Sequence, residues 1–391
     1  MAPLHPLRIK ISGYEQSITR FGVGALCMIF QELQRCEMLE FDGDWTMLAR
    51  FVPCTTALSF PQLRSFTASA CLGELVQGIG LVSPILRWFT YALQNAPRLV
   101  DVRVELPKIG IPNVLPYRQL TVIRVHTLKV AQVTHILWLC PNLKELEVDI
   151  LMPNQADFAH GAILHSNLQR LTIRSHLNWL ADFTRSLALH ALPVLRVFRL
   201  EIIPDQTLVY PRLPSSFFTM MRNLLSLEEF RLDSGLLCMH QTWCTDILEL
   251  CPNIRSLEID IEPGNDSEYI LHLIQNLTIR SAPSRTSAPA FAPKLTSLHL
   301  VEFDTYIRPT YIFAFLDMVE SRRDGAPGIA FERLAKAELR FTTRLDNDRI
   351  LHCCISDPLI RQRIKLLSEG GIECSIGTLY RKTLAHIALP S

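Results

Sequence analysis

The sequence predicts an α/β solenoid, in which short parallel strands alternate with helices along one repetitive domain of residues 1–391. Three observations support this fold class. A twelve-residue stretch occurs twice, an apolar frame derived from it recurs along the chain, and the segments between the frames have helical periodicity.

The duplicated stretch is the strongest of these signals. Leu139–Ile150 reads LCPNLKELEVDI and Leu250–Ile261 reads LCPNIRSLEIDI, so eight of the twelve positions are identical. The remaining positions include exchanges between leucine and isoleucine and between valine and isoleucine. Chance rarely produces such a pair, so the stretch indicates an internal repeat.

Reduced to its apolar positions, the repeated unit is L-x-x-L-x-L, and it recurs from one end of the chain to the other. Successive frames start 21 to 41 residues apart, close to the 20–29 residues of leucine-rich repeats. We therefore expect about ten or eleven irregular repeats. The frames are Leu63/Phe66/Ala68, Leu99/Val102/Val104, Leu120/Ile123/Val125, Leu143/Leu146/Val148, Leu168/Leu171/Ile173, Leu195/Phe198/Leu200, Leu227/Phe230/Leu232, Ile254/Leu257/Ile259 and Leu295/Leu298/Leu300, with weaker copies at Cys36/Leu39/Phe41 and Leu334/Ala337/Leu339.

The L-x-L part of each frame alternates with period two, so its two apolar side chains face one side of a strand. One such unit cannot bury its apolar edge alone, whereas stacked copies form a continuous core. The sequence thus predicts a leucine-rich-repeat horseshoe, with parallel strands on the concave face and helices on the convex face. A doubly wound sheet is the alternative, but it needs strands that are apolar on both faces, and these strands carry polar residues at alternate positions.

The segments between the frames place apolar residues at helical spacing. Helices are predicted at Ile85–Leu93, Val133–Leu139, Trp179–Leu189, Trp243–Leu250 and Tyr311–Val319. Trp88, Trp138, Trp179 and Trp243 fall in these helices and are expected to pack in the core. Segments rich in proline, glycine or serine predict loops, of which 281–294 and 321–330 are expected to be flexible. Residues 357–391 are expected to cap the stack, beginning with a helix at Asp357–Ser368.

Composition bears on the class of protein. Lys and Arg number 39 and Asp and Glu 38, a balance that disfavours nucleic acid or an anionic membrane as partner. We see no signal peptide and no membrane span, so we expect a cytoplasmic or nuclear protein. The eleven cysteines form no C-x-x-C pair, and the histidines form no metal-binding pattern. No metal, no cofactor and no enzymatic activity are therefore expected. A hydrolase remains as an alternative that would need a pocket with an activated cysteine or histidine.

The candidate binding residues lie between the last two apolar positions of each frame, where side chains face solvent in the predicted strands. Two arginine pairs, Arg103/Arg124 and Arg199/Arg231, stand out in this column. One interpretation is a docking surface of mixed charge; the other is a solvated face with cross-strand Arg–Glu ladders. The residues expected to contact a partner are Arg103, Arg124, Glu147, Thr172, Arg199, Arg231, Glu258 and His299.

The repeated CPNL-x-x-L-x-(V/I) frame, the preceding helix ends W-L-C-P and L-E-L-C-P, and the phrase Phe60–Phe66 resemble the leucine-rich-repeat region of F-box-like proteins. The long irregular repeats are most similar to the expanded families of basidiomycete, mushroom-forming fungi. The opening Pro3–Ile11 is similar to the strand that follows the F-box there. No F-box itself, with its L-P-x-E helix entry, is found before the repeats.

The resemblance implies a substrate-recognition region linked to a ubiquitin ligase. An F-box would dock on the ligase adaptor, so this chain would bind the adaptor only if an F-box is supplied. We therefore expect a protein–protein interaction module that binds a protein on the concave face. The alternative is a repeat scaffold with no ubiquitin role.

Overall fold

The fold is described from a computed structural model of the chain. The described residues are 6–13, 32–43, 59–69, 92–105, 115–152, 165–188, 190–203, 213–234, 243–261, 268–279, 291–302, 309–324, 331–341 and 356–378. The chain divides into two compact units. Unit 1 comprises Met1–Arg174 and Leu189–Val194, and unit 2 comprises Ser175–Ala188 and Leu195–Ser391.

Unit 1 consists mainly of strands with short helical turns before them. Its elements are β1 (Leu7–Gly13), η2 (Leu33–Arg35), β2 (Cys36–Gly43), β3 (Ser65–Ser69), β4 (Asp101–Glu105), η4 (Tyr117–Gln119), β5 (Val122–Lys129), α4 (Val130–Leu139), β6 (Glu145–Met152) and the greater part of β7 (Arg170–His176).

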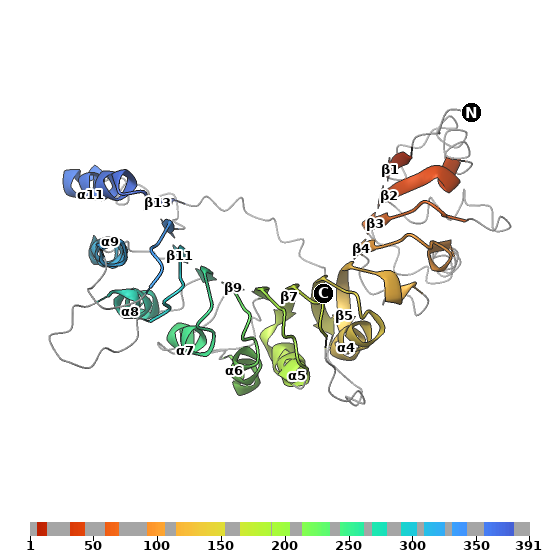
Figure 1. The fold of residues 1–391 in the computed structure, drawn as a ribbon, viewed down its shortest axis with the longest axis horizontal. Helices are drawn as coiled ribbons and strands as arrows, with labels where there is room; N and C mark the ends of the chain where they lie inside the picture. Colours follow the sequence, from red (N-terminus) through yellow and green to blue (C-terminus); the bar gives the residue numbers. More distant parts are fainter. Residues whose placement is uncertain are drawn as a thin grey trace, which may run out of the picture. The chain divides into compact units, whose positions relative to one another are not determined.

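Unit 2 alternates strands and helices more regularly. Its elements are α5 (Leu177–Ala188), β8 (Val197–Ile203), α6 (Ser215–Arg222), β9 (Glu229–Ser234), α7 (Trp243–Leu250), β10 (Ser256–Ile261), α8 (Glu268–Leu277), β11 (Ser297–Glu302), α9 (Pro309–Asp324), β12 (Lys336–Phe341), α11 (Pro358–Glu369) and β13 (Glu373–Thr378). In Figure 1, α6, α7, α8 and α9 lie along one side of the strands of this unit.

The strands of each unit pair in parallel, in the order of the chain. Equivalent frame positions face each other, so that Leu257 lies opposite Phe230 on one side and Leu298 on the other. These three side chains are buried. The predicted alternation of buried and exposed positions and the parallel pairing are confirmed. The horseshoe curvature, the concave placement of the strands and the single solenoid remain predictions.

A tight turn precedes most frames and adds a buried position that the frame did not include. The first leucine of the frame donates its N–H to the carbonyl three residues earlier, as Leu143 does to Cys140 (3.1 Å) and Ile254 to Cys251 (3.2 Å). Both cysteines are buried, and burial raises the pKa of each thiol to about 12. The duplicated stretch therefore adopts the same turn in both units, with the cysteine as an apolar core residue.

The asparagines of these turns link consecutive repeats. Asn142 Nδ2 donates to Arg118 O (2.7 Å) and Asn167 Nδ2 to Pro141 O (2.9 Å) in unit 1. In unit 2, Asn253 Nδ2 donates to Leu225 O (2.7 Å). Each bond satisfies a carbonyl of the preceding turn, so the turn asparagine contributes to stacking as well as to the turn.

One loop prediction is wrong in part. Residues 321–324, expected within a flexible loop, form the last turn of α9. Tertiary contacts explain this turn, because the buried Arg322 guanidinium donates to the carbonyls of Leu277, Phe291 and Ala292 (2.9, 2.5 and 3.1 Å). Burial lowers the pKa of Arg322 to about 10. Residues 281–290 and 325–330 of the two predicted loops lie outside the described residues.

The helix predictions hold for α4, α5, α7 and α9, and α7 has the predicted bounds. The α6 and α8 helices and the β13 strand were missed. Most of the predicted helix at Ile85–Leu93 lies outside the described residues. Trp243 is buried as predicted, but Trp138 on α4 is 58% exposed, because it lies on the face of the helix that carries His135 rather than Ile136 and Leu137.

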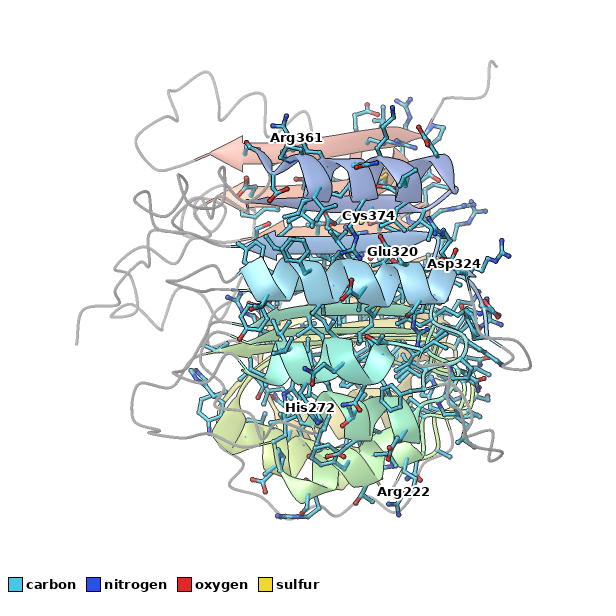
Figure 2. All side chains as sticks on the ribbon, turned by 90° about the vertical axis from the view of Figure 1, so that its left-hand side faces the viewer. Arg222, His272, Glu320, Asp324, Arg361 and Cys374 are labelled. Carbon is cyan, nitrogen blue, oxygen red and sulfur yellow. The ribbon has the colours of Figure 1, made fainter. Side chains whose placement is uncertain are left out.

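The predicted terminal helix is α11, which begins after Asp357 and is capped by that residue's carboxylate, an acceptor from Leu359 N–H at 2.8 Å. It packs against α9 through Arg363, which donates to Asp317 (2.6 Å) and Glu320 (2.7 Å). Glu320 lies on the side of α9 that faces α11 (Figure 2). Two carboxylates on α9 and the mostly covered guanidinium of Arg363 on α11 fix the register of this contact.

Candidate functional site

The candidate site in unit 1 is a row of side chains on the exposed face of its sheet. Strand pairing brings five predicted positions into line, one per strand. We call this the unit 1 row; it consists of Glu40, Thr67, Arg103, Arg124 and Glu147. Its polar side chains alternate along each strand with buried ones, which sets their direction. Thr172 occupies the corresponding position of β7, between the buried Leu171 and Ile173.

Arg103 and Arg124 face each other in neighbouring strands, as the sequence predicted. Each is balanced by carboxylates rather than by the other. Arg103 pairs with Asp101 on its own strand (3.2 Å), and Arg124 pairs with Glu147 (3.3 Å) and Glu145 (3.8 Å) on β6. The arginine pair therefore belongs to a network of ion pairs, which agrees with the cross-strand ladder interpretation.

The unit 2 row is built in the same way and comprises Arg199, Arg231, Glu258, His299 and Glu338. Arg199 pairs with Glu229 (2.8 Å), and Arg231 pairs with Glu258 (3.1 Å). His299 lies between two glutamates, with Nδ1 at 3.4 Å from Glu258 and Nε2 at 3.7 Å from Glu338.

This arrangement affects the protonation of Glu258. A hydrogen bond from His299 holds the pKa of the carboxyl below its usual value, and the charges of Arg231 and Arg199 act in the same direction against the opposing effect of burial. Glu258 is therefore an anion at neutral pH, and it accepts from one neighbour on each side. Ion pairs therefore hold the charged side chains of this row in place along the sheet.

The geometry of these rows leaves hydrogen-bond donors accessible to a ligand. The arginines remain 35–42% exposed, so their outer N–H groups can reach a ligand while carboxylates hold their inner ones. The five described cysteines are all buried, and burial raises the pKa of Cys36, Cys140, Cys244, Cys251 and Cys374. A thiol that stays protonated is a poor nucleophile. Within the described ranges no group of three histidine, cysteine or acidic side chains has a metal-binding arrangement.

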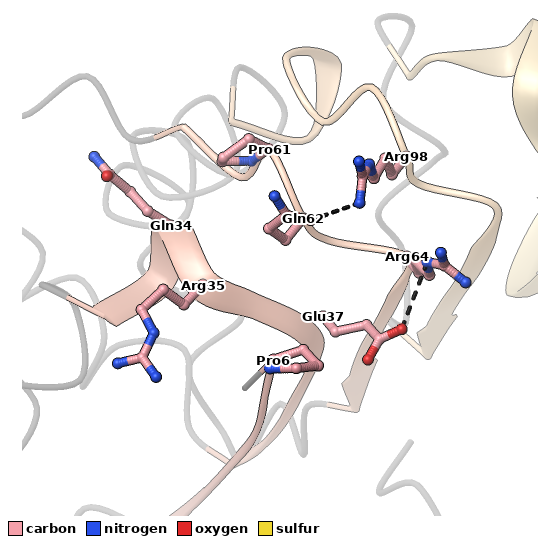
Figure 3. A pocket seen from close by; sticks show the side chains of 8 residues that line it. All are labelled: Pro6, Gln34, Arg35, Glu37, Pro61, Gln62, Arg64 and Arg98. Carbon is pink, nitrogen blue, oxygen red and sulfur yellow. Dashed lines mark hydrogen bonds and ion pairs between the residues drawn. The ribbon is translucent and has the colours of Figure 1, made fainter. Parts of the chain in front are cut away.

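A second polar feature, not predicted from the sequence, lies where the strands of unit 1 begin. It is a hollow of about 470 Å³. Figure 3 shows Gln62 and Arg98 reaching toward each other (2.7 Å) and Arg64 beside Glu37 (3.5 Å). The lining residues are Pro6, Gln34, Arg35, Glu37, Pro61, Gln62, Arg64 and Arg98. Three of these eight residues are arginines, of which Arg35 and Arg98 precede the first apolar residue of their frames and Arg64 follows it.

Comparison with known proteins does not show a family. No family model matches the chain, and no curated protein matches it. Among solved structures, the chain is similar to a crystal structure of a protein from Bacteroides fragilis, at 10% identity and a TM-score of 0.33. The match covers 82% of this chain and 66% of that protein. None of the helices in the described part of the chain has the length and apolarity of a membrane span. The features established for this chain are therefore its repeated parallel strands and the two rows of polar side chains on them.

Proposed function

We propose that this protein is a non-enzymatic recognition module that binds a protein partner on the exposed face of its strands. The observation that carries the proposal is the pair of ordered polar rows, with arginines that are both ion-paired and accessible. Ion pairing fixes these long side chains before binding, so less conformational entropy is lost when a partner contacts them.

The composition of the rows indicates the type of partner surface. Arginine is enriched at protein interfaces, where its planar group binds carboxylates and backbone carbonyls. Each row carries both cations and anions, so a complementary partner also carries both signs. A purely anionic ligand would meet Glu147 next to Arg124 and Glu258 next to Arg231.

A narrower form of the proposal assigns the partner to ubiquitin chemistry. The resemblance of the CPN-containing repeats to F-box-like proteins supports a role in presenting a substrate to a ubiquitin ligase. No F-box is found in the sequence, so co-purification of the folded chain with the ligase adaptor tests whether the chain makes this link without one. Failure to bind the adaptor would leave the scaffold alternative, in which the rows hold partners together without ubiquitin transfer.

The main proposal is tested by charge reversal. Partners are captured with the tagged chain from an extract of its own organism, and the dominant one is purified and its affinity measured. Arg199→Glu/Arg231→Glu should weaken this affinity at least about tenfold, roughly 1.4 kcal/mol. A double variant of exposed helix residues in unit 2, Arg222→Glu/Lys365→Glu, makes the same change in net charge and should bind like the wild type. Equal affinity of all three proteins would refute the proposal, provided that circular dichroism shows them folded.

A further inference from the structure

The strand-entry side of unit 1 carries more positive charge than its sheet face. The turns before β3, β4, β5 and β6 contribute one exposed cation each, and we call this set the basic edge: Arg64, Arg98, Arg118 and Lys144. It continues the hollow of Figure 3, which Arg64 and Arg98 line together with Gln34 and Gln62.

Backbone hydrogen bonds bring these turns together at one edge of the sheet. Arg64 N–H donates to Glu37 O (2.8 Å), Val100 N–H to Arg64 O (2.9 Å), Thr121 N–H to Val100 O (2.9 Å) and Lys144 N–H to Thr121 O (2.8 Å). The parallel ladder thus extends past the strands into the turns. Neighbouring turns are spaced like the strands, about 4.8 Å apart, and the basic edge extends over about 14 Å.

Three of the four cations of the edge have no carboxylate partner among the described residues. Arg64 is paired with Glu37, but Arg98 contacts only the neutral Gln62, and the side chains of Arg118 and Lys144 make no ion pair with any described residue. The carboxylate of Glu145, which follows Lys144, is held by Arg124 and Arg170. This contrasts with the sheet rows, where each arginine has a carboxylate partner.

We propose that the basic edge of unit 1 is a second binding site, which takes an extended acidic peptide segment of a partner protein. About 14 Å corresponds to about four or five residues of extended chain at 3.3–3.4 Å each. Carboxylates suit the guanidinium groups of Arg98 and Arg118, and the amides of Gln34 and Gln62 offer donors to peptide carbonyls.

The observations favour a peptide over nucleic acid. Proteins that bind single strands stack bases on exposed aromatic rings. The aromatic residues of these described turns, Phe60 and Tyr117, are 0% and 9% exposed and belong to the core. The site is separate from the sheet rows, so its validity does not depend on the proposed function.

The test uses the full chain and a fluorescein-labelled peptide of about six glutamates, with binding followed by fluorescence anisotropy at low ionic strength. We expect the wild type to bind, with an affinity that falls as salt is added. Arg98→Glu/Arg118→Glu should weaken binding about tenfold or more. Both side chains are exposed, so the variant should melt like the wild type.

Two variants of equal net charge serve as controls. Arg222→Glu/Lys365→Glu and the sheet variant Arg199→Glu/Arg231→Glu should both bind the peptide within about twofold of the wild type. The proposal is overturned if all three double variants weaken binding alike, because net charge alone would then explain it. It is also overturned if the wild type does not bind the peptide, or if an oligothymidylate of equal charge binds more tightly and is lost with the same variant.

Discussion

His165 shows how one repeat position can carry a polar side chain into the core. It occupies the buried turn position that Cys140 holds one repeat earlier, and its Nε2 donates to Cys140 O at 2.8 Å. Its Nδ1 has no hydrogen-bond partner among the described groups. Burial lowers the pKa of His165, because the charged ring would lose its hydration.

This position predicts a pH dependence with a definite sign. The folded state binds a proton at His165 less readily than the unfolded state, whose imidazole titrates near 6.5. The free energy of unfolding should therefore fall as pH drops below about 7. His165→Leu removes this contribution, so its urea midpoint should change less between about pH 7 and pH 5 than that of the wild type. The hydrogen bond lost costs about 1 kcal/mol at neutral pH. An unchanged pH slope in the variant would contradict the assignment.

At the scale of the element, the turn before each strand does more than connect it to a helix. Its asparagine joins consecutive repeats, and Asn253 does so twice, because its Oδ1 also accepts from Lys294 Nζ (2.6 Å) in the following turn. Three successive turns of unit 2 are thereby linked through one side chain.

Asn253→Ala should lower the free energy of unfolding by about 0.5–1.5 kcal/mol, since Leu225 O loses its donor and Lys294 loses its acceptor. Guanidinium unfolding followed by circular dichroism measures the change. Gln169→Ala is the control, because this exposed turn residue makes no side-chain hydrogen bond among the described residues, and it should stay within about 0.5 kcal/mol. Equal losses of stability in both variants would show that the hydrogen bonds of Asn253 make no specific contribution to the free energy of unfolding.

The elements could be predicted wherever local pattern decides structure. The period-two frames give the strands and the buried faces, and the WCTDILEL segment gives α7 with its bounds. The α8 segment carries buried Ile270, Leu273, Ile274 and Leu277 at helical spacing, so its signal was present and overlooked. The last turn of α9 could not be predicted, because it depends on carbonyls that Arg322 meets only in the folded chain.

Part of the candidate site could likewise be predicted from the sequence, and part could not. The alignment of Arg103 with Arg124 follows from period two and parallel register, and it was predicted. The partner of each arginine was not, because a diagonal carboxylate such as Glu229 is selected by side-chain rotamers. The basic edge was missed because Arg64, Arg98 and Arg118 occupy different positions of their repeats.

At the scale of the whole molecule, a repeat that contacts only its neighbours should confine the effect of a core defect. Leu300→Ala removes a fully buried side chain of β11 and should cost about 2–5 kcal/mol. Hydrogen exchange should show lost protection in β10, β11 and β12, with β4 and β5 of unit 1 close to wild type. Leu225→Ala is the control, since Leu225 is 67% exposed and its truncation should change little. Uniform loss across both units would mean that they unfold as one cooperative body.

The paired cysteine turns give the protein a matched set of internal reporters. Cys140 and Cys251 have the same flanking residues and the same shielded thiol, one in each unit. An alkylating reagent can modify either thiol only when its own turn opens, and their similar chemistry makes the two rates directly comparable. Peptide-resolved alkylation of the native protein would therefore time the opening of each unit separately, with no engineered label.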